Sequence, residues 1–127
     1  MDLLLVTHTF LWWAEGSTKL SNIALASIQD QSNSIYLSDV SVWEIQIKAQ
    51  LGKIQLQLPL RQLVEDHIAN GIKTLPISTE HILEVGTLPP LHKDPFDRLL
   101  VAQARIEAFL LVTRDPAITS YKVRTLW

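Results

Sequence analysis

Three carboxylates follow apolar stretches of this chain, at positions where an α/β enzyme places reacting groups. Glu44 comes shortly after the apolar run Ile35–Leu37, and Asp115 comes shortly after Phe109–Thr113. Asp97 begins a long helical pattern. Because ligands of parallel sheets bind beyond the carboxyl ends of the strands, these acids are expected to converge. Clustered carboxylates repel and need a cation, and oxygen-only ligands favour Mg²⁺ or Mn²⁺, which activate water against phosphodiesters.

Each acid also has a purely structural interpretation. Ser41 and Glu44 have the spacing of a capping box, in which Ser41 bonds the Glu44 amide and the Glu44 side chain bonds back. Glu44 and Lys48 are four residues apart, which favours an ion pair on the helix surface. Glu44 also shares a helix face with Ile47 and Leu51, which would turn it towards the sheet. Spacing alone leaves both interpretations open.

The segment around Asp97 combines a helix start with a buried stripe. Asp94 is predicted to cap a helix whose first residue is Pro95, and Asp97 complements the dipole of that helix. Asp97 also heads the apolar stripe formed by Leu100, Val101 and Ala104. An acid on a buried stripe is desolvated, which is costly unless it is partnered. Asp115 precedes a proline, as in an Asp-Pro turn that starts a short helix.

The elements around these acids alternate in type. Strands are predicted at Leu3–Val6, Ile35–Leu37, Lys73–Pro76, Phe109–Thr113 and Lys122–Leu126. Helices are predicted after Thr7–Thr9 and at Leu20–Gln31, Ser41–Leu51, Leu60–Asn70, Thr79–Val85 and Pro95–Ala108. This alternation predicts an α/β fold, with a mostly parallel, twisted sheet of four to five strands covered by helices on both faces.

Composition limits the function classes. The 127 residues fit one domain, 1–127, and 47% hydrophobic content suffices for a core. A net charge of −2 argues against a binder held to nucleic acid mainly by phosphate contacts. The absence of cysteine excludes a disulfide, a thiolate nucleophile and a cysteine zinc site. No apolar run approaches the ~18 residues that span a bilayer, and a cytoplasmic protein is expected.

Four segments resemble the PIN-domain family, specifically the VapC-type toxins of toxin–antitoxin pairs. They are Leu3–Trp13, Ser38–Lys48, Leu88–Ala104 and Leu110–Asp115, and the third is the most specific. The resemblance implies a three-layer PIN-like fold and a Mg²⁺- or Mn²⁺-dependent endoribonuclease with four acidic positions. It also implies a cognate antitoxin, an RNA substrate and a homodimer.

Residue by residue, the resemblance assigns three of the four acids. Glu44 matches the second acid, Asp97 the third and Asp115 the fourth, so that these three are the expected catalytic and metal-holding residues. Thr7 matches a hydroxyl that follows the first acid, and Thr113 matches a hydroxyl that lines the site.

The first acidic position is Val6. Relatives read L-L-L-D-T-H here, whereas this chain reads L-L-L-V-T-H. Val6 offers no oxygen, so affinity for a hard cation is expected to fall. Asp2 lies four residues back along the strand, roughly 13 Å away at ~3.3 Å per residue. Asp39 is the nearest candidate to compensate, with a helix-entry cap as its structural alternative.

Basic and aromatic residues add candidates for substrate and partner contacts. Expected phosphate contacts are Arg98, Arg105, Arg114 and Lys48. His8 follows the first strand and is a candidate for the site, whereas surface or capping roles are expected for His67, His81 and His92. The aromatic cluster Phe10, Trp12 and Trp13 is expected to serve packing or a dimer or partner surface, rather than base stacking.

Two functions remain open from the sequence. One is a metal-dependent endoribonuclease toxin, and the other is a catalytically inactive PIN module that still binds its antitoxin and RNA. A phosphoryl-accepting receiver domain is disfavoured, because no lysine is placed by a motif to clamp a phosphoryl group. Cleavage of RNA by this chain and by Val6→Asp separates the first two.

Overall fold

The N-terminal apolar run forms the central strand of a parallel sheet. The computed structural model describes residues 1–127 and contains five strands in the order β3-β2-β1-β4-β5, all paired in parallel. Their bounds are β1 Asp2–Leu5, β2 Ser34–Ser38, β3 Lys73–Leu75, β4 Leu110–Val112 and β5 Thr125–Leu126. The predicted sheet is confirmed, and its last strand is an edge strand of two residues.

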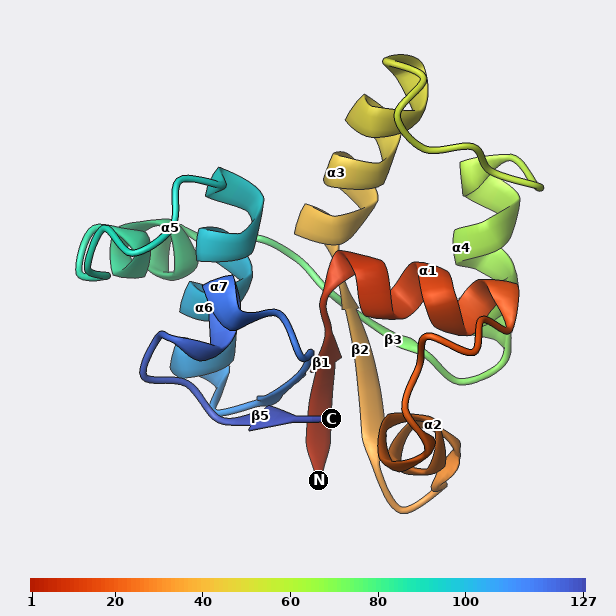
Figure 1. Cartoon of the computed structure of the whole chain (residues 1–127), viewed down its shortest axis with the longest axis horizontal. Helices are drawn as coiled ribbons and strands as arrows, with labels where there is room; N and C mark the ends of the chain where they lie inside the picture. Colours follow the sequence, from red (N-terminus) through yellow and green to blue (C-terminus); the bar gives the residue numbers. More distant parts are fainter.

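Seven helices surround the sheet. They are α1 Thr7–Glu15, α2 Asn22–Gln29, α3 Asp39–Gln50, α4 Leu60–Ala69, α5 Thr79–Val85, α6 Pro95–Glu107 and α7 Pro116–Thr119. In Figure 1, α1, α2 and α4 lie on one side of the strands, and α5, α6 and α7 lie on the other. The three-layer α/β arrangement is therefore confirmed. None of the helices is long and apolar enough to cross a membrane.

Strand β1 separates two apolar cores. Leu3 and Leu5 pack with residues of α1, α2 and α4, whereas Leu4 and Val6 pack with residues of α6 and α7. Side chains alternate between the faces of a strand, so this run is apolar throughout because both faces are covered. The alternation also directs the side chain at position 6 towards α6, the helix that carries Asp97.

Helix α3 begins earlier than predicted. Its N-cap is Ser38, whose hydroxyl accepts a hydrogen bond from the Val40 amide at 3.0 Å. The capping box predicted for Ser41 and Glu44 is wrong, because both residues are buried inside the helix. The Ser41 hydroxyl instead lies 3.1 Å from the Thr7 hydroxyl. Strand β2 passes directly into the helix, so the last residue of the strand is the cap.

Helix α6 begins as predicted. Asp94 is its N-cap and accepts hydrogen bonds from the amides of Phe96 (2.8 Å) and Asp97 (3.1 Å), and Pro95 is the first helical residue. The helix continues to Glu107 and ends at Ala108, which adopts a left-handed conformation. The cap fixes the first turn of α6 and with it the backbone of Asp97.

The N-terminal aromatic residues divide between core and surface. Phe10 is fully buried, and Trp13 packs edge-on against His67 with ring centroids 5.1 Å apart. The predicted packing role is confirmed for these two residues. Trp12 instead lines a cavity at the carboxyl ends of the strands.

Candidate active site

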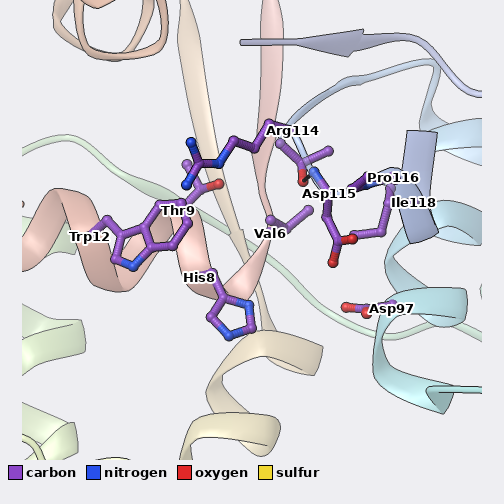
Figure 2. A pocket seen from close by; sticks show the side chains of 10 residues that line it. Val6, His8, Thr9, Trp12, Asp97, Arg114, Asp115, Pro116 and Ile118 are labelled. Atoms are coloured by element: carbon purple, nitrogen blue, oxygen red, sulfur yellow. Dashed lines mark hydrogen bonds between the residues drawn. The ribbon is translucent and has the colours of Figure 1, made fainter. Parts of the chain in front are cut away.

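A cavity of about 490 Å³ opens where β1 and β4 end. Its lining comes from three places: the start of α1, the first turn of α6 and the junction between β4 and α7. Figure 2 shows the side chains of Asp97 and Asp115 on one side of Val6, and those of His8 and Trp12 on the other. Two of the three predicted acids therefore share one cavity.

Asp97 lies partly buried on the first turn of α6. Its side chain is 16% exposed, and its Oδ2 lies 2.8 Å from His92 Nε2. Burial raises the pKa of the Asp97 carboxyl, and the nearby charges of Asp94 and Glu44 raise it further, while the His92 bond opposes the rise. Asp97 is thus a carboxylate whose negative charge is poorly compensated, which is favourable for binding a cation.

Asp115 is held at the junction of β4 and α7. Its Oδ1 accepts a hydrogen bond from the Ala117 amide at 3.0 Å, which caps the short helix α7. The Asp115 amide donates to the Thr113 hydroxyl at 3.1 Å. The predicted Asp-Pro helix start is therefore present, and the same residue also lines the cavity. Thr113 is buried, lines the cavity too and steadies the backbone of Asp115.

Glu44 is buried and does not line the cavity. It is 1% exposed, and the Thr7 hydroxyl donates to its Oε1 at 2.6 Å. The ammonium group of Lys48 bonds its other oxygen, Oε2. The predicted ion pair is present, but the prediction that it lies on the surface is wrong for Glu44. Burial lowers the pKa of Lys48, but the bond and charge of Glu44, with the charges of Asp94 and Asp97, outweigh burial and raise it.

Lys48 therefore supplies part of the positive charge that the cluster of acids requires. An ion pair with a buried partner stabilises only when its geometry satisfies the remaining hydrogen-bonding groups, and Thr7 does so here. This arrangement ties α1 to α3. The ammonium group of Lys48 is bound to Glu44, and Lys48 does not line the cavity, so its contact with phosphate stays a prediction.

Val6 stands in the floor of the cavity. It is 4% exposed, and it is the N-cap residue of α1, where its side chain makes no capping hydrogen bond. It contributes an apolar surface between His8 and Asp115 (Figure 2). The site thus lacks both a carboxylate and a helix cap at this position.

Two further sequence candidates do not line the cavity. Asp39 is exposed at the first residue of α3 and is absent from the lining, which gives no support to its proposed compensation for Val6. Arg98 is engaged within the protein: its guanidinium donates to the Tyr121 hydroxyl at 3.0 Å and to the carbonyls of Pro89 (3.0 Å) and Val85 (3.2 Å). Arg98 holds the segment before α6 in place, and we withdraw its assignment to phosphate.

The sequence interpretation missed the role of His92. A surface or capping role was expected, but its ring bonds Asp97 and its amide donates to Tyr121 at 3.0 Å. His92, Asp94 and Asp97 bring ligand atoms within 4.8 Å of one another. The available signal was the position of His92 two residues before the Asp94 cap, where the chain turns back over the first helical turn. His81, by contrast, completes a capping box with Ser78 at the start of α5, as expected.

Comparison with known proteins identifies the family. The model of the PIN domain matches residues 3–123 of the chain. The chain belongs to the PIN-domain family. The resemblance carried by its acidic motifs is therefore confirmed, and the receiver-domain alternative is wrong.

Relatives of this PIN-domain chain are similar along its whole length. Ribonuclease VapC22 of Mycobacterium tuberculosis is 28% identical over 120 residues, which cover 94% of this chain and 91% of that protein. The structure of VapBC2 from Rickettsia felis, bound to a DNA fragment from its promoter, matches with a TM-score of 0.75 at 16% identity, covering 100% of this chain and 99% of that one. DNA-bound VapBC from Salmonella typhimurium matches with a TM-score of 0.65 at 17% identity and 99% and 97% coverage. At these identities the structures support the fold.

The donor set of the cavity fits the divalent cation that the PIN family implies. Asp97 and Asp115 present carboxylate oxygens to one cavity, and Mg²⁺ is often held by one or two carboxylates together with water and substrate phosphate. The fit is reduced at two points. Val6 offers no oxygen, and the oxygens of Glu44 are already bonded to Thr7 and Lys48.

Proposed function

We propose that this chain is an endoribonuclease of the VapC type, the metal-dependent toxin of a toxin–antitoxin pair. The observation that carries the proposal is the pair of carboxylates, Asp97 and Asp115, in one cavity at the carboxyl ends of β1 and β4. The name of the relative VapC22, a ribonuclease, supports the same reaction class. Cytoplasmic RNA is the substrate in this proposal.

The residues in and beside the cavity have separate roles in this proposal. Asp97 and Asp115 would hold Mg²⁺ or Mn²⁺, which when bound activates water and stabilises charge on the phosphate. His92 orients Asp97 through its hydrogen bond, and Thr113 orients Asp115. Arg114 carries the positive charge that faces the substrate phosphates.

Glu44 and Thr7 contribute to this site without lining the cavity. The carboxylate of Glu44 adds negative charge near Asp97, which favours a cation in the cavity. Thr7 holds Glu44 and thereby joins the start of α1 to α3. In this proposal Glu44 adds negative charge near the cation and does not itself bind it. Its carboxylate oxygens become ligands only if the bond to Lys48 opens.

Val6 favours a second candidate, an inactive PIN module. It removes one carboxylate from the cavity, while Lys48 neutralises another acid nearby. Such a module would still bind its antitoxin, and RNA, on the same surfaces. An antitoxin partner is suggested by the VapBC complexes among the related structures. A homodimer is proposed from the family resemblance.

Cleavage of a structured RNA in Mn²⁺ and in EDTA tests the proposal. The wild-type chain is expected to cleave only with Mn²⁺, and Val6→Asp is expected to cleave faster. Asp97→Asn and Asp115→Asn are expected to cleave more than about 100-fold more slowly, because the loss of even an outer-shell partner of a metal site lowers activity by roughly 10–100-fold. Asp66→Asn, which removes an exposed acid from α4, is the matched control. Cleavage by Val6→Asp alone would establish the inactive module. Activity that persists in EDTA, or that survives Asp97→Asn, contradicts the proposal.

A further inference from the structure

The wall of the cavity opposite the acids is aromatic and positively charged. Arg114 follows β4 and places its guanidinium carbon 5.4 Å from the centre of the Trp12 ring and 5.7 Å from that of Trp127. The two indoles meet edge to face with centroids 5.9 Å apart. Arginine above an indole is held by cation–π attraction. Trp12 and Arg114, here named the stacking wall, therefore form one preorganised group, which Trp127 supports from outside the cavity lining.

Arg114 is available for a ligand. It is exposed, it forms none of the salt bridges of the molecule, and it donates no hydrogen bond to the protein. Its neighbour Asp115 is turned to cap α7 rather than to pair with it. The guanidinium thus rests on apolar rings with its N–H groups unused, which leaves five donors for a charged partner.

Position distinguishes this wall from an ordinary surface contact between arginine and tryptophan. Trp12 and Arg114 line the same cavity of about 490 Å³ as Asp97 and Asp115 (Figure 2). A volume of this size is within the range that encloses small organic groups. A substrate that reaches the acids therefore also meets the flat wall.

We propose that Trp12 and Arg114 form a stacking site for an unpaired RNA base beside the phosphodiester that is bound at Asp97 and Asp115. Indole and guanidinium planes stack on bases of any sequence. Because Arg114 (5.4 Å) and Lys19 (5.8 Å) lie over the Trp12 ring, the base stacks on the guanidinium plane that Trp12 supports, and the free N–H groups at the edge of that plane face the adjacent phosphate. The inference rests on the proposed function and adds what the acids alone do not provide, a contact with the base next to the phosphodiester. Bases inside a duplex have both faces covered and do not enter.

The test measures binding without cleavage, in EDTA, by fluorescence anisotropy. The probes are a labelled oligoadenylate of about twelve nucleotides, an abasic ribose-phosphate strand of equal charge, and the oligoadenylate paired with its complement. Wild type is expected to bind oligoadenylate about 5- to 100-fold more tightly than the abasic strand, the range of base–aromatic stacking. It is also expected to bind oligoadenylate more tightly than the duplex.

Variants separate stacking from charge. Trp12→Leu is expected to remove most of the preference for bases while binding of the abasic strand stays unchanged, and Trp12→Phe to retain part of the preference. Arg114→Gln is expected to weaken binding of both strands. The matched controls are Trp43→Leu, an exposed tryptophan outside the cavity, and Arg61→Gln, an exposed arginine on α4. Both controls are expected to bind as wild type does.

The outcomes distinguish this inference from the proposed nuclease. Equal binding of oligoadenylate and abasic strand, no measurable binding of oligoadenylate, or a Trp12→Leu variant that behaves like Trp43→Leu overturns the stacking site. Cleavage that depends on Asp97 but not on Trp12 overturns the stacking site and leaves the nuclease intact. Base-dependent binding through Trp12, without any cleavage in Mn²⁺, supports the stacking site and refutes only the nuclease.

Discussion

At position 6 one side chain affects both the charge of the cavity and the start of a helix. An aspartate there would place a carboxylate beside Asp97 and Asp115, and it would also cap α1, whose N-cap Val6 makes no side-chain bond. The two effects oppose each other. The cap stabilises by about 0.5–2 kcal/mol, whereas a third carboxylate in a partly buried cavity repels the other two.

Val6→Asp is therefore expected to make stability depend on the divalent cation. In EDTA its melting temperature should lie close to that of the wild type, because cap and repulsion offset each other. Added Mn²⁺ should raise it more than it raises the wild type, because a ligand that binds the folded state stabilises it. Differential scanning fluorimetry in Mn²⁺ and EDTA measures this, with Val6→Asn as the control that caps without charge. Equal shifts of the melting temperature on addition of Mn²⁺ for wild type, Val6→Asp and Val6→Asn would contradict a cation site at position 6.

Asp97 links the stability of the fold to pH. Because burial raises its folded pKa above the ordinary value of 3.8, its contribution to stability is full below that value and is lost as pH rises through the folded pKa. At pH 7 the charged carboxylate is a net cost. Asp97→Asn is therefore expected to melt higher than wild type at pH 7, although it cleaves poorly, and the difference should shrink as pH falls towards 4. If Asp97→Asn melts at the same temperature as wild type at pH 7, or below it, burial is not the cause of the raised pKa of Asp97.

Asp94 stabilises the start of α6, and this role can be separated from catalysis by experiment. Asp94 caps the helix, yet it also lies with His92 and Asp97 in the cluster whose ligand atoms are within 4.8 Å. If Asp94 acts as a cap, Asp94→Asn should preserve both stability and cleavage, whereas Asp94→Ala should lose about 1 kcal/mol and cleave more slowly. Urea unfolding and RNA cleavage of the two variants measure this. Loss of cleavage in Asp94→Asn with stability intact would make Asp94 a cation ligand instead.

Element positions were largely predictable from the sequence because their signals are local. The cap at Asp94 and the first helical residue Pro95 act within one turn, and the structure confirms both. The cap of α3 was placed wrongly, since Ser38 and Ser41 are equally good caps and only the end of β2 decides between them. The burial of Glu44 was one of two alternatives that its helix spacing left open, although Leu51 on the same predicted face is exposed. Its bond to Thr7, thirty-seven residues away in sequence, is encoded by no local pattern.

For the molecule as a whole, the parallel sheet explains why distant acids meet. Every strand is parallel, so the starts of α1, α3 and α7 all follow the same edge, where β1, β2 and β4 end. Negative charge therefore accumulates at one edge of the sheet, and Lys48 balances part of it. The stacking wall arises from the same geometry, because α1 brings Trp12 and the end of β4 brings Arg114 to that edge.

The two cores share the central strand, and this predicts how the molecule unfolds. Leu5 belongs to the core beneath α1, α2 and α4, and Leu4 belongs to the core beneath α6 and α7, although they are adjacent in sequence. Both are fully buried, so Leu4→Ala and Leu5→Ala should each lower the free energy of unfolding by roughly 2–5 kcal/mol. Leu58→Ala, at an exposed site, should have little effect.

Because β1 pairs with both β2 and β4, neither core can open without breaking the middle of the sheet. Each variant should therefore unfold in urea in a single transition, monitored by far-ultraviolet circular dichroism and by tryptophan fluorescence, with coincident curves. In a background in which Trp12, Trp43 and Trp127 are replaced by phenylalanine, fluorescence reports on one core, because Trp13 of α1 packs against His67 of α4. The circular dichroism signal reports on all seven helices. A Leu4→Ala protein that loses helical signal before the fluorescence changes would show that the core beneath α6 and α7 unfolds independently. The shared strand β1 would then not couple the two cores.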